Sequence, residues 1–139
     1  MKQRVLFICT HNSARSQMAE GILKKLYGDS YEVYSAGTQP TSVNPYAIKV
    51  MTEIGIDISS YRVKSVEEFL GMNLDYIVTV CDHAKATCPF FPGGVNYLHQ
   101  GFEDPSQFTG TEAEILAGFR RVRDEIKEWI ENTFNKRSV

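Results

Sequence analysis

The chain lacks long apolar runs and an excess of basic residues. No stretch approaches the roughly 20 apolar residues that a membrane-spanning helix needs. The net charge of −2 provides no basic footprint for nucleic acid. We therefore expect no membrane and no nucleic-acid partner. The 139 residues suit one compact domain, residues 1–139, without repeats or linkers, and we expect it to be a monomer.

Cysteine is also scarce. Three cysteines, an odd number, do not make a closed disulfide framework. The first four residues lead directly into an apolar segment without a small-residue cleavage site, so we expect no signal peptide. Together these features predict a cytoplasmic protein with reduced and reactive thiols.

Strand and helix patterns alternate along the chain. Apolar or alternating runs predict strands at residues 5–8, 31–35, 76–80 and 95–98, the last being the weakest. Helical spacing and capping residues predict helices at 17–27, 45–54 and 65–69, and a long helix that follows Thr111. This order is typical of an α/β fold with a parallel sheet covered on both faces.

The most informative segment, residues 9–16, reads CTHNSARS and lies between the first strand and the first helix. Backbone N–H groups at a helix N-terminus attract anions and lower the pKa of a nearby thiol, so Cys9 is a candidate nucleophile. Arg15 offers a planar, charged fork for two oxyanion oxygens, and Ser16 can donate to the thiolate. The predicted oxyanion loop comprises Thr10, His11, Asn12, Ser13, Ala14, Arg15 and Ser16.

A simpler interpretation of this segment exists. A cysteine and an arginine at this spacing also occur by chance, and a cysteine at a strand end is usually a small buried hydrophobe. The preceding strand, the small polar residues inside the loop and the following helix favour the functional interpretation.

Cys81 and Cys88 follow the third predicted strand and allow three interpretations. They can be incidental, or they can bind zinc together with His83 and His99, although the spacing differs from that of the usual ligand pairs. They can also form a redox pair that takes over oxidation from Cys9, which requires the thiols to approach within disulfide distance.

Asp104 precedes a proline in the loop after the last predicted strand. An Asp-Pro pair commonly starts a turn, but a carboxylic acid above an oxyanion site could also protonate a leaving oxygen. Glu103 competes for this role. Because ligands bind beyond the carboxyl ends of parallel strands, we expect Cys9, Cys81 and Asp104 at one edge of the sheet.

Several segments carry a family resemblance. They are residues 9–21 (CTHNSARSQMAEG), 34–37 (YSAG), 44–45 (NP), 55–59 (GIDIS), 78–81 (VTVC), 88–89 (CP), 101–105 (GFEDP) and 119–126 (FRRVRDEI). Over nearly its whole length the chain resembles the thioredoxin-coupled arsenate reductases, which share the fold of low-molecular-weight protein tyrosine phosphatases. The resemblance implies a three-layer α/β/α sandwich around a four-stranded parallel sheet.

The resemblance also implies a mechanism. Cys9 would attack arsenate, for which phosphate and sulfate are analogues, while Arg15 holds the oxygens and Asp104 protonates the departing one. Cys81 would then attack Cys9 and release arsenite, and Cys88 would attack Cys81. The resulting disulfide would be reduced by thioredoxin, with glutaredoxin or mycothiol as other donors, and no cofactor is expected.

Some residues depart from the family pattern. Ala14 replaces a second loop cysteine that the relay does not use, and His11 replaces a common glycine. Some members bind potassium near Asn12, Glu20 and Ser35, but Arg62 and Lys64 stand where further oxygen ligands would be expected, so we expect no metal.

Two other functions remain open. One is a phosphatase for aryl or tyrosine phosphates that uses the same loop and Asp104 but needs neither Cys81 nor Cys88. The other is a non-enzymatic thiol module that binds arsenite or senses oxidation, which leaves Arg15 and Asp104 without a role.

Overall fold

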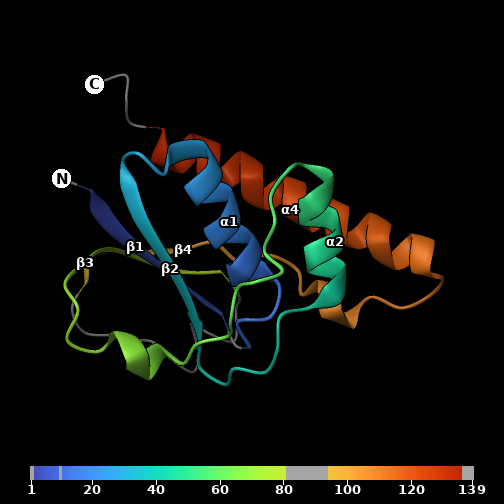
Figure 1. Cartoon of the computed structure of the whole chain (residues 1–139), viewed down its shortest axis with the longest axis horizontal. Coiled ribbons are helices and arrows are strands. Elements are labelled where there is room, and N and C mark those ends of the chain that lie inside the picture. Colours follow the sequence, from blue (N-terminus) through green and yellow to red (C-terminus); the bar gives the residue numbers. More distant parts are fainter. Residues whose placement is uncertain (1, 10, 81–93, 136–139) are drawn as a thin grey trace.

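A computed structural model describes residues 2–9, 11–80 and 94–135. Four strands, β1 (Gln3–Cys9), β2 (Tyr31–Gly37), β3 (Leu74–Thr79) and β4 (Gly94–His99), form one sheet in the order β2-β1-β3-β4. All neighbouring strands are parallel, so their carboxyl ends meet at one edge. The predicted four-stranded parallel sheet is confirmed (Figure 1).

In the part of the chain that is described, three α-helices accompany the sheet: α1 (Arg15–Tyr27), α2 (Pro45–Glu53) and α4 (Glu112–Phe134). Their starts follow local chemistry. The Asn44 side chain accepts hydrogen bonds from the first turn of α2, and Thr111 and Glu114 form a reciprocal capping box on α4. Gly55 ends the α2 segment with a φ of +81°, a conformation that glycine adopts without strain.

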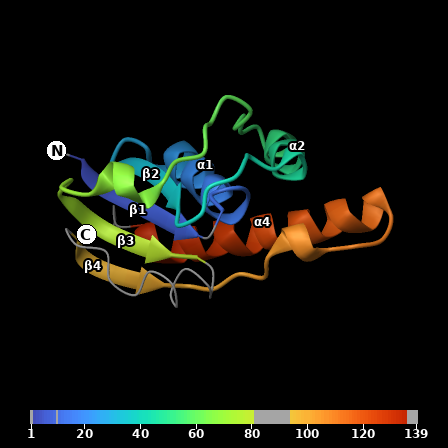
Figure 2. The same ribbon diagram turned by 90° about the horizontal axis from the view of Figure 1, so that it is seen from below.

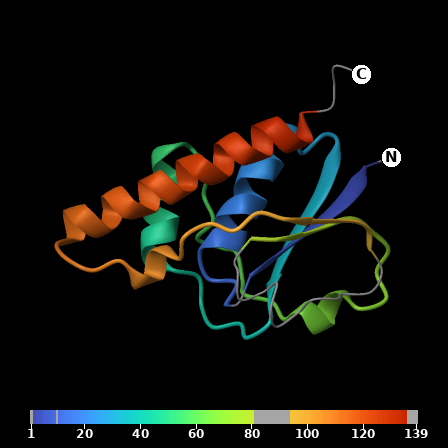
Figure 3. The same cartoon turned by 180° about the vertical axis from the view of Figure 1, so that it is seen from behind.

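Helices cover one face of the sheet. Phe134 of α4 packs edge-on against Phe7 and Tyr76, and the neighbouring Ser35 of β2 bonds to Glu20 of α1, so α1 and α4 lie on the same face. The long α4 runs across this face and lies in front of α1 and α2 in the view of Figure 3.

The opposite face carries a short helix. The 3-10 helix η1 (Val66–Phe69) places Phe69 against Tyr34, which precedes Ser35 in β2 and therefore faces the other side of the sheet. A second 3-10 helix, η2 (Pro105–Gln107), leads from the sheet edge toward α4. The strand β4 forms an edge of the sheet (Figure 2).

The core is built as the sequence pattern predicts. The central strand β1 is buried from Val5 to Cys9, consistent with a strand covered on both faces. The apolar stripe of α4 contributes its buried residues to the same core: Phe119, Val122, Ile126, Ile130 and Phe134. This packing fixes the carboxyl end of β1, where the predicted loop begins.

Candidate active site

Cys9 is the last residue of β1, and α1 begins at Arg15. Only 2% of Cys9 is exposed. The N-cap residue of α1, Ala14, provides no side-chain cap, so the N–H groups of the first helical turn can bind an anion instead. The helix α1 starts at Arg15, two residues earlier than the apolar pattern predicts, so Arg15 and Ser16 belong to its first turn.

The Ser16 hydroxyl lies 2.9 Å from the Cys9 sulfur. The Asn12 amide donates to the Ser16 oxygen at 2.8 Å, which leaves the hydroxyl hydrogen available to the sulfur. Asn12 also donates to Ser35 and accepts from Gln17 through Oδ1. Its φ of +53° is the left-handed conformation that asparagine tolerates. This buried network favours the thiolate form of Cys9.

Arg15 is 8% exposed and lies over the same end of the sheet. One guanidinium nitrogen donates to the Phe102 carbonyl at 3.1 Å, and another lies 3.4 Å from the Asp104 carboxylate. These contacts orient the guanidinium beside Cys9. Arg15 can therefore bind an oxyanion held above the sulfur.

Asp104 lies across the pocket from the loop. Burial acts to raise the pKa of Asp104, but hydrogen bonds from Ser106 and the charges of Arg15 and His11 outweigh it, and the pKa lies below the ordinary aspartate value. Its carboxylate also accepts from the Ser106 N–H and caps η2, so Asp104 starts a turn and faces the pocket as well.

The neighbouring Glu103 makes a different contact. Its carboxylate accepts a 2.7 Å hydrogen bond from Arg121 on α4, and it does not line the pocket. Of the two candidate acids, only Asp104 faces Cys9.

The pocket over Cys9 has a volume of about 140 Å³. The buried residues Cys9 and Arg15 line its interior, and the exposed residues Thr41 and Ser106 lie toward its mouth. From the predicted loop His11, Ser13, Ala14 and Arg15 line it as well; Thr10 lies outside the described residues.

The region near Asn12, Glu20 and Ser35 tests the potassium expectation. The Glu20 carboxylate accepts from Ser35 at 2.5 Å and from Lys24 at 2.7 Å, and the Lys64 ammonium lies 3.7 Å from it. Asn12 Oδ1 accepts from the Lys64 N–H. Because cations and N–H donors already meet these oxygens, the residues do not fit a further cation.

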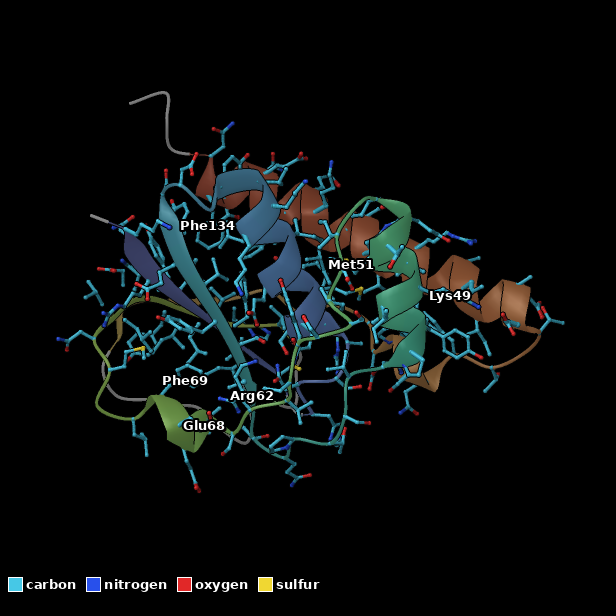
Figure 4. All side chains as sticks on the ribbon, in the orientation of Figure 1. Lys49, Met51, Arg62, Glu68, Phe69 and Phe134 are labelled. Carbon is cyan, nitrogen blue, oxygen red and sulfur yellow. The ribbon has the colours of Figure 1, made fainter. Side chains whose placement is uncertain are left out.

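Burial lowers the pKa of the Lys64 side chain, and the Glu20 carboxylate acts in the opposite direction. The neighbouring Arg62 instead points to Glu68 of η1, to which it donates hydrogen bonds of 2.7 and 3.1 Å (Figure 4). Arg62 therefore pairs with η1, whereas Lys64 is the cation that faces Glu20.

Cys81, Cys88 and His83 lie outside the described residues. Next to this gap, the Val80 N–H donates to the Ile8 carbonyl at 2.9 Å. The residue before Cys81 is thus hydrogen-bonded to the residue before Cys9. His99, the remaining member of the zinc interpretation, contacts Thr79, and the part of the chain that is described holds no cluster of three metal-ligating side chains.

The sequence patterns missed several pocket groups. They are Thr41, Ser106 and the carbonyls of Gln39 and Phe102, which reach the oxyanion loop only through the path of the chain. An aspartate followed by proline and serine is typical of a helix start, and this signal could have indicated that Ser106 lies beside Asp104 in the pocket.

Comparisons with known proteins agree with this geometry. The chain is 50% identical over 125 residues to an arsenate reductase of Halalkalibacterium halodurans, covering 90% of each chain. A solved arsenate reductase in the phosphate-binding state is 34% identical, with a TM-score of 0.78 and coverage of 94% of this chain and 95% of that one. A thioredoxin-dependent arsenate reductase of Corynebacterium glutamicum is 29% identical, with a TM-score of 0.69, and covers 97% of this chain and 64% of that one.

The similarity to arsenate reductases that the sequence predicts is therefore confirmed. Within the described residues no helix is long and apolar enough to cross a membrane. Residues 4–137 match the low molecular weight phosphotyrosine protein phosphatase family, and the chain belongs to that family.

Proposed function

We propose that the protein reduces arsenate to arsenite with Cys9 as the nucleophile and Cys81 and Cys88 as the resolving thiols. The observation that carries the proposal is the pocket in which the Ser16 hydroxyl lies 2.9 Å from the Cys9 sulfur while Arg15 and Asp104 face it. Arsenate reductases that cover 90% of this chain, and a phosphate-bound one of the same fold, support the oxyanion substrate.

In the first step the Cys9 thiolate attacks the arsenic atom of arsenate. Arg15 and the N-terminal N–H groups of α1 hold the charged oxygens, and one oxygen leaves as water after protonation. Asp104 supplies that proton. Because the pKa of Asp104 is lowered in the free pocket, its carboxylate first takes up a proton from the incoming dihydrogen arsenate and then delivers it to the departing oxygen.

In the second step the Cys81 thiolate attacks the Cys9 sulfur. A sulfur–sulfur bond forms, the sulfur–arsenic bond breaks, and the electron pair leaves with arsenic as arsenite. Cys88 then attacks Cys81 and frees the Cys9 thiolate. The pairing of Val80 with Ile8 supports the approach of Cys81, because each of these residues directly precedes a cysteine.

Thioredoxin is the proposed electron donor for the Cys81–Cys88 disulfide, by similarity to the thioredoxin-dependent relative. The relay starts from reduced thiols, so we place the protein in the cytoplasm. We propose that it acts as a monomer, since one chain contains every group that the mechanism uses.

A phosphatase activity is the second candidate, supported by the family and by a pocket that also suits phosphate.

The Cys81→Ser variant separates a reductase from a phosphatase. A reductase loses multiple-turnover arsenate reduction in this variant and keeps any hydrolysis of p-nitrophenyl phosphate. Unchanged arsenate reduction in Cys81→Ser would contradict the relay, and arsenite binding without turnover in the wild type would favour the thiol module.

A further inference from the structure

His11 lines the same pocket as Cys9 and Asp104, but the mechanism above does not use it. The residue is half-buried, between the buried Cys9 and the exposed mouth. Arg15 and Asp104 line this pocket with it, so His11 borders the place where an anion would bind.

The hydrogen bonds of the ring determine which nitrogen is available. His11 Nδ1 lies 3.0 Å from the Gln39 carbonyl oxygen. Because a carbonyl only accepts, Nδ1 carries a proton and donates it. Nε2 is then the nitrogen that can meet a bound ligand, and a proton on Nε2 makes the ring a cation.

The backbone holds the imidazole in place. Three further hydrogen bonds join the loop to the following segment: Thr38 N–H to the Cys9 carbonyl at 3.2 Å, Thr41 N–H to the His11 carbonyl at 3.1 Å, and Asn44 N–H to the Ser13 carbonyl at 2.9 Å. The ring is therefore held against a fixed wall of the pocket.

We propose that His11 determines the substrate specificity of the pocket, selecting free tetrahedral oxyanions over oxyanions that carry an aryl group. Its Nε2 forms a hydrogen bond with an outward-facing oxygen of the anion, which an ester or aryl phosphonate lacks. Its ring also takes up space on the path that an aryl group would need. The inference rests on the proposed function for its substrate, arsenate, but concerns only the binding step.

The charges that face His11 fit this role. Arg15 supplies a permanent cation, and Asp104 supplies a carboxylate that can share a proton with the bound anion. With Arg15 on one side and His11 on the other, a free oxyanion meets a hydrogen-bonding side chain from two walls of the pocket. An aryl group in place of the outward-facing oxygen removes the contact with His11.

The test measures protection of Cys9 from iodoacetamide in the full chain carrying Cys81→Ser and Cys88→Ser, which leaves one thiol. Inorganic phosphate and phenylphosphonate are the two probes, and neither requires reduction. His11→Asn is the matched variant: its amide can still donate to the Gln39 carbonyl, but it has no atom in the place of Nε2. His11→Gly removes both the contact and the ring.

We expect phosphate to protect about fivefold less well in both variants, the loss of one half-exposed charged hydrogen bond. Phenylphosphonate should protect better in His11→Gly than in the wild type, so the ratio of the two affinities falls by about tenfold or more. A ratio is used because general damage to the loop would weaken both ligands alike.

Phosphate protection that is unchanged in His11→Asn would overturn the anion contact, and an unchanged ratio in His11→Gly would overturn the steric role. Arsenate turnover is measured separately. A wild type that binds phosphate as expected but never reduces arsenate would refute the proposed function and leave this inference standing.

Discussion

Removal of the Ser16 hydroxyl tests the activation of Cys9. Ser16 is fully buried, and its oxygen already accepts from Asn12, so its hydrogen is directed to the Cys9 sulfur at 2.9 Å. A hydrogen bond to a charged group contributes about 1.5 to 3 kcal/mol. Since about 1.4 kcal/mol corresponds to one pH unit, Ser16→Ala should raise the pH midpoint of Cys9 alkylation by about 1 to 2 units.

The assay is the rate of iodoacetamide alkylation against pH in the chain with Cys9 as its one thiol. Ser30→Ala, an exposed serine beyond the far end of α1, is the matched control and should leave the midpoint unchanged. A Ser16→Ala midpoint equal to that of the wild type would show that the helix N-terminus and Arg15 alone stabilise the thiolate, and would refute the reasoning.

Three further predictions concern the pocket and the fold. Arg15→Lys should weaken phosphate protection of Cys9 by about tenfold or more, because lysine cannot form the two-pronged contact; equal protection would contradict the assignment. Asp104→Asn should lower the single-turnover rate of the Cys9–arsenate step by about 100-fold, whereas Glu103→Gln should keep the wild-type rate; equal rates in both would exclude Asp104 as the acid. Hydrogen bonds from Arg120 lower the pKa of Glu53 from 4.5 to about 2 and outweigh the opposite effect of burial. The ionised Glu53 therefore stabilises the folded protein fully above pH 4.5, and this contribution is lost as the pH falls toward 2. Thermal unfolding of Glu53→Gln should therefore depend less on pH in this range than that of the wild type, and parallel curves would contradict the claim.

The sequence predicted the site best where local chemistry decides the structure. Cys9 after an apolar run and the loop that precedes a helix need only the neighbouring residues, and so does the capping box of Thr111 and Glu114. The order of elements was enough to indicate a parallel sheet, because each strand is followed by a helical segment or a loop that can carry the chain back to the opposite edge, where the next strand begins.

Other features depend on contacts between distant segments. Lys64 meets Glu20, and Phe102 meets Arg15, only because the sheet brings their loops to one edge. The start of α1 carried no signal either, because its cap residue Ala14 makes no side-chain hydrogen bond. The edge strand β4 exposes Val95, so its pattern is weaker than that of the buried β1.

The central claim is a three-thiol reduction of arsenate. Its most direct test is arsenate-dependent oxidation of NADPH in the presence of thioredoxin and thioredoxin reductase, for the wild type and Cys88→Ser. The account predicts sustained oxidation with the wild type and, with Cys88→Ser, at most one arsenite released per protein. Sustained turnover in Cys88→Ser, or none in the wild type with any thiol donor, would contradict it.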